Sequence, residues 1–225
     1  MSRQARLGIE CYQKIVLQLS NKIYIWLIAL ACLVSFSSSF GSKLNLIEPI
    51  FFNKFLISFN QIQFYDFQTT YLISNEWWRL LTPMLIHFSP THLIFNCLWV
   101  YILGKEIEDF DGKWLFLTLI LITSAASNYA QYAFSGPSIF GGLSGVVYGL
   151  LGFCFVQETF SRINKYSFPP AIYLFMFIWL FIGFTGFLYL LGFGKIANFA
   201  HLGGLISGII CGYLFQMYNS RKNYE

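Results

Sequence analysis

A serine in a glycine-rich segment and a histidine in a distant apolar segment are the parts of a hydrolytic site. The serine is Ser144, within the run Gly141-Gly142-Leu143-Ser144-Gly145, and the histidine is His201, within Ala200-His201-Leu202-Gly203-Gly204. A serine hydroxyl becomes a strong nucleophile when a neighbouring histidine accepts its proton. Polar groups are costly inside a bilayer and usually mark function there. The pair therefore predicts a Ser–His site within a membrane.

Both residues also have an ordinary structural interpretation. A serine in a membrane helix commonly bonds a backbone carbonyl of the preceding turn, and a buried histidine is commonly a hydrogen-bonded core residue. Ser144, however, stands where a helix is expected to begin. Unpaired N–H groups and the positive end of the helix dipole gather there, and these groups can stabilise an oxyanion.

Stripes of small residues at a spacing of four accompany the serine and the histidine. They are Gly141, Gly145 and Gly149 in one segment, and Ala200, Gly204, Gly208 and Gly212 in the other. Stripes of this kind let two membrane helices approach closely. Since each polar residue is one step from its stripe, packing of the two faces is expected to bring Ser144 and His201 together.

A third apolar segment carries further polar side chains. His92 and Asn96 are four residues apart and share one helix face, which Trp99 and Leu103 extend inward. An asparagine in a membrane helix is often simply a hydrogen-bonding contact between helices, and His87 fits a loop-bracing role better than a chemical one. Yet His92 and Asn96 lie near the outer end of their segment, at the level expected for Ser144 and His201.

The elements that must position these residues are membrane helices. The chain has 225 residues, of which 56% are hydrophobic and 11% charged, too few charges to cover a soluble globule. No long run alternates with period two, so helices are favoured over a barrel. We expect an all-α six-helix bundle in one membrane domain (23–217), between a short N-terminal segment (1–22) and a C-terminal tail (218–225). The expected spans are Ile23–Phe40, Pro90–Leu103, Trp114–Ala133, Ser144–Val156, Ala171–Leu191 and Ala200–Met217.

The basic residues predict the orientation of the bundle. Ten lie in the termini and the loops that share their side, and four lie opposite. This asymmetry predicts cytoplasmic termini. An alternative is signal-peptidase cleavage near Ala29-Leu30-Ala31, which would leave five spans. The net charge of +4 needs no nucleic-acid partner. Five cysteines without CxxC spacing argue against a disulfide framework or a metal site.

Two stretches have unusual lengths. The first external loop, residues 41–89, is rich in aromatic side chains and is expected to lie partly in the membrane interface, either as an ordinary amphipathic loop or as a lateral brace. The fourth span, Ser144–Val156, covers 13 residues, roughly 20 Å against a hydrocarbon core of about 30 Å. Ser144 is therefore expected below the outer membrane surface, behind a loop that dips inward.

Together these residues resemble the rhomboid family of intramembrane serine proteases, in its compact bacterial six-span form. The resemblance covers residues 76–213. The matching motifs are Trp78-Arg79, the run from His87 to Asn96, Gly141–Gly145 with Tyr148, and Ala200-His201 with Gly204 and Gly208. The segment Thr185–Asn198 fits the family pattern poorly, so no gate residues are assigned there.

The resemblance implies a role for each site residue. Ser144 would be the nucleophile and His201 its general base, in a dyad without an aspartate. His92 and Asn96 would hold the oxyanion together with the Ser144 backbone N–H, and Tyr148 would pack under His201 and orient it. Trp78 and Arg79 would be structural residues of the first loop, and Glu108 would brace the cytoplasmic end of the second span.

The expected function is that of an intramembrane endopeptidase in a bacterial inner membrane. It would need no cofactor or metal and would cleave single-span or multi-pass membrane proteins near the outer face. Substrate helices with Gly, Ala, Ser or Pro near the cut are favoured because hydrolysis requires local unwinding. One alternative is an inactive relative that binds client membrane helices. An unrelated transporter or haem protein is a further alternative, although paired histidines or midplane ion ligands would then be expected.

Overall fold

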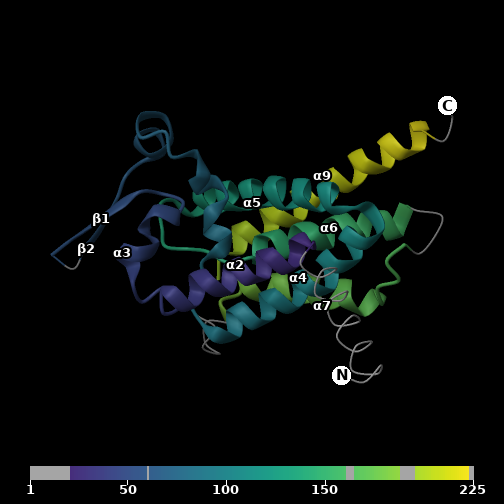
Figure 1. Cartoon of the computed structure of the whole chain (residues 1–225), viewed down its shortest axis with the longest axis horizontal. Helices are drawn as coiled ribbons and strands as arrows, with labels where there is room; N and C mark the ends of the chain where they lie inside the picture. The colour runs from purple at the N-terminus through teal and green to yellow at the C-terminus, as the bar shows by residue number, and fades with distance from the viewer. Residues whose placement is uncertain (1–20, 60, 161–164, 188–195, 223–225) are drawn as a thin grey trace, which may run out of the picture.

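The computed structural model describes residues 21–59, 61–160, 165–187 and 196–222, so most of the expected N-terminal segment lies outside the described residues. Its long helices run roughly along one direction, with the strands at one end (Figure 1). In the described residues six helices have 15 residues or more. They are α2 (Ile23–Ser37), α4 (Pro90–Asp111), α5 (Lys113–Ser135), α6 (Ser144–Phe160), α7 (Pro170–Phe184) and α9 (Asn198–Lys222).

Each of these helices occupies the place of one expected span, although several boundaries differ. The second helix, α4, has 22 residues and continues past the expected end at Leu103 to Asp111. The fourth, α6, has 17 residues rather than 13 and continues past Val156 to Phe160. Its length alone therefore accounts for less of the expected depth of Ser144. Among the described residues, one stretch, Asn198–Ser220 of α9, is both long and apolar enough to cross a membrane by itself, and α2 and α7 are shorter apolar helices.

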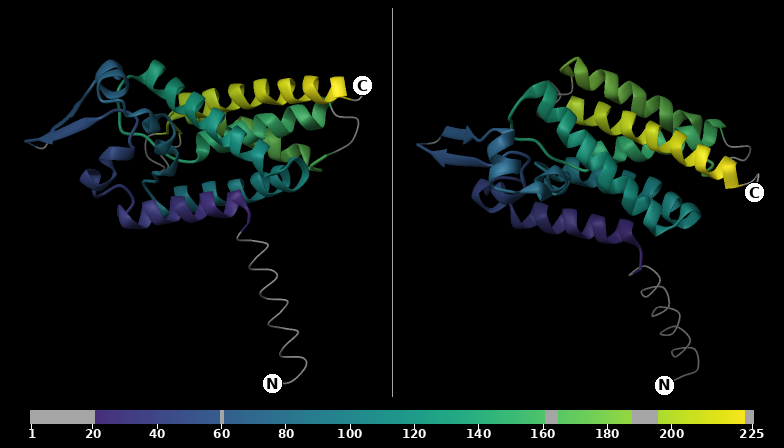
Figure 2. Two further views of the ribbon diagram at one scale, coloured as in Figure 1. Left: turned by 45° about the horizontal axis from the view of Figure 1, so that its top comes forward. Right: turned by 90° about the horizontal axis from the view of Figure 1, so that it is seen from above.

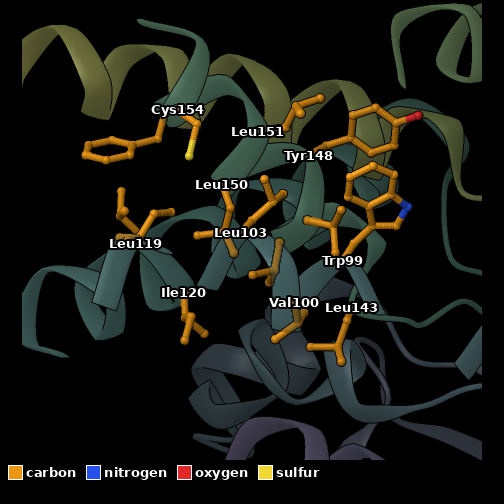
Figure 3. Packing of buried hydrophobic residues seen from close by; sticks show 14 of the residues in the cluster. Trp99, Val100, Leu103, Leu119, Ile120, Leu143, Tyr148, Leu150, Leu151 and Cys154 are labelled. Carbon is orange, nitrogen blue, oxygen red and sulfur yellow. The ribbon is translucent and has the colours of Figure 1, made fainter. Parts of the chain in front are cut away.

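The centre of the bundle is α6, which packs chiefly against α9. A Cβ atom built on Gly204 would collide with the carbonyl oxygen of Gly145, and one on Gly208 with that of Gly149. The two small-residue stripes therefore face each other at backbone contact, as the spacing predicted. Below them, buried apolar side chains of α4, α5 and α6 interlock (Figure 3).

Local chemistry explains where α4 begins. The Ser89 side chain accepts a hydrogen bond from the backbone N–H of His92 at 3.2 Å, and Pro90 occupies the first helical position. Serine caps and first-turn prolines are strong start signals for helices. The capped end of α4 fixes the direction of the face that carries His92 and Asn96.

The start of α2 is held by another helix. The carboxylate of Glu108, on α4, accepts hydrogen bonds from the backbone N–H groups of Ile23 at 3.1 Å and Tyr24 at 3.2 Å. Beside it, the hydrogen bond from Lys22 to Asp109 raises the pKa of the Lys22 ammonium. Glu108 thus caps the otherwise uncapped first turn of α2, a brace at the end of α4 that matches the role implied for it.

Replacing Glu108 with alanine is expected to destabilise the protein by about 1 to 3 kcal/mol, because two backbone N–H groups lose their charged acceptor. The measurement is unfolding of purified protein in detergent. Glu106→Ala is the matched control, since among the described residues the Glu106 carboxylate accepts a hydrogen bond only from the exposed Lys105, at 3.2 Å. Equal stability of the Glu108 and Glu106 variants would show that water replaces the cap.

The first loop contains a β-hairpin that the sequence analysis did not anticipate. Strand β1 (Phe55–Ser58) pairs antiparallel with β2 (Gln61–Phe64). Figure 2 shows the hairpin projecting beyond the rest of the described chain at that end of the bundle. The remaining loop folds into short helices. These are α3 (Leu44–Ile47), η1 (Glu48–Ile50), η2 (Gln68–Ile73), η3 (Trp77–Leu80) and η4 (Thr82–Leu85).

Arg79 holds this loop together from its interior. Its guanidinium is buried and donates to the Glu76 carboxylate at 2.5 Å, to the Glu48 carbonyl oxygen at 2.6 Å and to the Phe51 carbonyl oxygen at 3.1 Å. Burial alone would raise the pKa of the Glu76 carboxyl, but hydrogen bonds from Lys54 and Arg79 outweigh it and lower that pKa. The loop is therefore a folded unit.

Candidate active site

The glycine-rich loop that precedes Ser144 is pressed against the first loop. The Gly142 N–H donates to the Pro83 carbonyl oxygen of η4 at 3.0 Å. A Cβ atom on Gly141 would lie 2.8 Å from that same oxygen and from the Ile86 Cβ atom. Gly142 has a φ of +127°, which L side chains rarely adopt. Glycine at these two positions is thus required by close approach and by backbone conformation.

His87 holds Leu143, the next residue of this loop, by a hydrogen bond. Its Nε2 atom accepts from the Leu143 N–H at 3.4 Å, and its Nδ1 atom lies 3.2 Å from the Leu85 carbonyl oxygen. Since a carbonyl can only accept, Nδ1 carries the proton. His87 is fully buried and braces the loop, in agreement with the structural interpretation that its position favoured.

Ser144 begins α6, and its hydroxyl reaches His201 on α9. The distance from Ser144 Oγ to His201 Nε2 is 2.8 Å. His201 is buried, whereas Ser144 is only half-buried. Within the described part of the chain, no carboxylate is hydrogen-bonded to His201. The pair can therefore transfer a proton from the hydroxyl to the imidazole without a third charged group.

Tyr148 fixes the plane of the His201 ring. The two rings are stacked, with centroids 4.8 Å apart and planes inclined by 28°. The Tyr148 hydroxyl donates to the Met176 carbonyl oxygen of α7 at 3.0 Å. The histidine is thus held between its own helix and a tyrosine that is itself anchored to a third helix.

His92 and Asn96 face the glycine-rich loop from α4. A Cβ atom on Gly142 would lie 2.7 Å from His92 Cε1 and 3.5 Å from Asn96 Nδ2, so both side chains reach the same backbone position. Asn96 is buried, and its Nδ2 atom has no hydrogen-bond partner among the residues that the structure describes. A buried amide N–H beside the glycine-rich loop that leads into α6 is a donor suited to an oxyanion.

Sequence reasoning missed one positioning residue, Gln131 of α5. Its Oε1 atom accepts from the Ala200 N–H at 3.1 Å, immediately before His201. The same N–H also donates to the Ala197 carbonyl oxygen at 3.0 Å, so Gln131 shares this donor and ties the start of α9 to α5. A glutamine in an apolar span was the available signal, but its partner is 69 residues away in the sequence.

Across residues 21–59, 61–160, 165–187 and 196–222, no group of three or more His, Cys, Asp or Glu side chains could hold a metal ion. The chemistry that the described side chains can perform is proton transfer and nucleophilic attack by a hydroxyl.

Comparison of the chain with known proteins identifies the family to which it is similar. Residues 74–218 match the Rhomboid domain. A protein of Haemophilus influenzae described as rhomboid protease GlpG is 35% identical over 140 residues, which are 62% of this chain and 70% of that protein. The helical bundle and these similarities define an all-α membrane protein. The chain belongs to the rhomboid family.

Proposed function

We propose that the protein is an intramembrane serine endopeptidase with Ser144 as nucleophile and His201 as general base. The observation that carries the proposal is the 2.8 Å contact between Ser144 Oγ and His201 Nε2. In the first step the hydroxyl proton moves to Nε2 while Oγ attacks the peptide carbonyl carbon. The imidazolium then protonates the departing amine, leaving an acyl ester on Ser144. Water, deprotonated by the same imidazole, hydrolyses the ester and restores both residues.

The negative oxygen of each tetrahedral intermediate needs hydrogen-bond donors. The proposed donors are the Asn96 amide, the His92 imidazole and the Ser144 backbone N–H at the start of α6. Two observations support them: the unpartnered Asn96 Nδ2 atom, and the position of both α4 side chains against Gly142. Stacking on Tyr148 holds His201 in the orientation that both proton transfers need.

The substrates proposed are single-span or multi-pass membrane proteins, cut near the outer face. The support is the family, the apolar character of the helices and the position of the pair at the first turns of α6 and α9. We also propose six spans, from the six apolar helices, and an inner-membrane location, from the family. The asymmetry of the basic residues supports cytoplasmic termini.

Cleavage of a single-span test substrate by the purified protein in liposomes tests the function, with the cut mapped by mass spectrometry. A cut in the outer half of the substrate span supports the proposal, and a cut in the cytoplasmic half contradicts the proposed depth. If the protein only bound client helices, the intact substrate would co-purify with it and no cut would form. Labelling of Ser144 by a fluorophosphonate separates a reactive serine from an inert one.

Replacing Asn96 with alanine is expected to lower kcat by about 10- to 1,000-fold, because one oxyanion donor is removed. A donor that acts only in the transition state lowers kcat and kcat/KM equally. The measurement is steady-state cleavage of the test substrate. Asn219→Ala, at the far end of α9, is the control. An unchanged kcat for Asn96→Ala would make Asn96 a contact between helices.

A further inference from the structure

A cavity of about 310 Å³ lies where the starts of α2 and α5 meet the last turns of α4. Its lining residues are Asn21 and Lys22, just before α2, Glu108 of α4, and Lys113, the first residue of α5. Figure 2 shows the start of α2 at the end of the bundle opposite the β-hairpin, which is the end proposed to face the cytoplasm. The proposed hydrolysis makes no use of this cavity.

The lining of the cavity has an excess of positive charge. The ammonium groups of Lys22 and Lys113 face it together with one carboxylate, that of Glu108. The Glu108 carboxylate accepts hydrogen bonds from two backbone N–H groups at the positive end of α2, which compensate much of its charge. The first turn of α5 has no side-chain cap, so its N–H groups add to the positive potential. This lining favours an anion.

Lys113 is the cation that this cavity leaves available. Among the described residues no carboxylate is paired with Lys113, and the two acidic residues that precede it most closely in the sequence are paired with other lysines. Asp109 pairs with Lys22 and Lys105, and Asp111 pairs with Lys165. An anion that enters the cavity can therefore bind Lys113 without breaking an existing ion pair.

Aromatic side chains mark the level of the cavity in the membrane. The Lys113 ammonium lies 5.5 Å from the centroid of the Trp114 ring, and that ring is exposed. On α2, the exposed Trp26 follows Lys22 by four residues. Tryptophan gathers where a membrane meets water, and basic cavities between membrane helices on the cytoplasmic side bind anionic head groups. The surroundings therefore favour a lipid over a soluble anion.

We propose that this cavity binds the head group of an anionic phospholipid of the cytoplasmic leaflet, whose phosphodiester accepts hydrogen bonds from Lys113, Lys22 and the Asn21 amide. The bound lipid joins α2 to α4 and α5. It stabilises the folded protein, because a ligand that binds only the folded state shifts the equilibrium toward it. The inference depends on the proposed orientation in the membrane and is independent of protease activity.

Native mass spectrometry of the purified protein in detergent tests this inference by measuring the dissociation constant of a single bound lipid. The probe is dioleoylphosphatidylglycerol, and the comparison without net charge is dioleoylphosphatidylcholine. The wild-type protein is expected to bind phosphatidylglycerol more tightly. Lys113→Gln is expected to weaken that binding by about 5-fold, the contribution of one basic residue near an anionic surface. Lys113→Arg keeps the charge and is expected to retain most of the affinity.

Lys105→Gln is the matched control. Lys105 lies near the same end of α4, pairs with Glu106 and does not line the cavity, so its variant is expected to keep wild-type affinity. Equal weakening in the Lys105 and Lys113 variants would show a general attraction to the surface and overturn the inference. Equal affinity of the wild-type protein for the two lipids would also overturn it.

A soluble anion is the remaining occupant to exclude. Millimolar sodium phosphate is expected to leave the bound lipid in place, as sodium chloride of the same ionic strength does. Displacement by phosphate alone would mean that the cavity holds a free anion, and the lipid would be the wrong ligand. Each of these outcomes leaves the proposed protease function untouched, because cleavage of the test substrate is measured separately.

Discussion

Replacing Ser144 with alanine is expected to abolish peptide hydrolysis, lowering kcat by about 10⁴-fold or more. The substitution removes one half-buried hydroxyl, which in the structure bonds to His201. It leaves the start of α6 and the packing of α9 intact, so the free energy of unfolding is expected to stay within about 0.5 kcal/mol of the wild-type value. The measurements are cleavage of a single-span substrate in liposomes and unfolding in detergent.

Two further variants make this result specific. His201→Ala is expected to lose comparable activity, since a hydroxyl without its base is a weak nucleophile. Ser37→Ala, at an exposed hydroxyl that bonds a carbonyl of its own helix, is expected to keep wild-type activity. Cleavage that persists in Ser144→Ala would mean another nucleophile or a contaminant, and the proposed mechanism would be wrong.

Replacing Gly208 with alanine is expected to destabilise the bundle by about 1 to 3 kcal/mol, the usual cost of overpacking. The new Cβ atom would overlap the Gly149 carbonyl oxygen, a backbone atom that cannot rotate away. Helices α6 and α9 must therefore separate. The higher helix propensity of alanine, about 1 kcal/mol, is too small to compensate for a larger loss of packing. Unfolding in detergent measures the change.

The same substitution is expected to reduce activity, because Ser144 and His201 are carried by the two helices that separate. Ile210→Ala is the control: Ile210 lies on the same helix but is 53% exposed, and its truncation is expected to have little effect. Wild-type stability and activity in Gly208→Ala would show that the interface can absorb a methyl group, and the small-residue stripes would lose their proposed role.

Much of the helical framework could be predicted from the sequence because its signals are local. Apolar runs marked the six long helices, and Ser89 with Pro90 marked the start of α4. The predicted end of the fourth helix at Val156 was wrong because most of the residues that follow it in α6 are polar. Gln157 reads as an end signal, yet its side chain donates to the Gly212 carbonyl oxygen at 3.0 Å, so the helix continues within the bundle.

The hairpin could not be anticipated for a different reason. Its strands have four residues each, and three of the four residues in β1 are exposed, so no alternating pattern marks that strand. Within the site, residue types and spacing predicted that Ser144 and His201 would meet. The contact of Gln131 with Ala200 of α9 could not be predicted in this way, because only the folded chain brings these two residues together.

The attachment of the glycine-rich loop has a consequence for how the protein responds to its surroundings. The backbone of the glycine-rich loop is hydrogen-bonded to Pro83 and His87. Helix α5 contacts the same region, since Asn128 donates to the Leu80 carbonyl oxygen at 2.8 Å. Arg79 in turn clamps the loop that contains these residues. Membranes of different thickness tilt helices to match their hydrophobic length. Because the segment before the nucleophile takes its shape from the first loop and from α5, we expect tilting of the outer helices to leave the dimensions of the reactive centre unchanged.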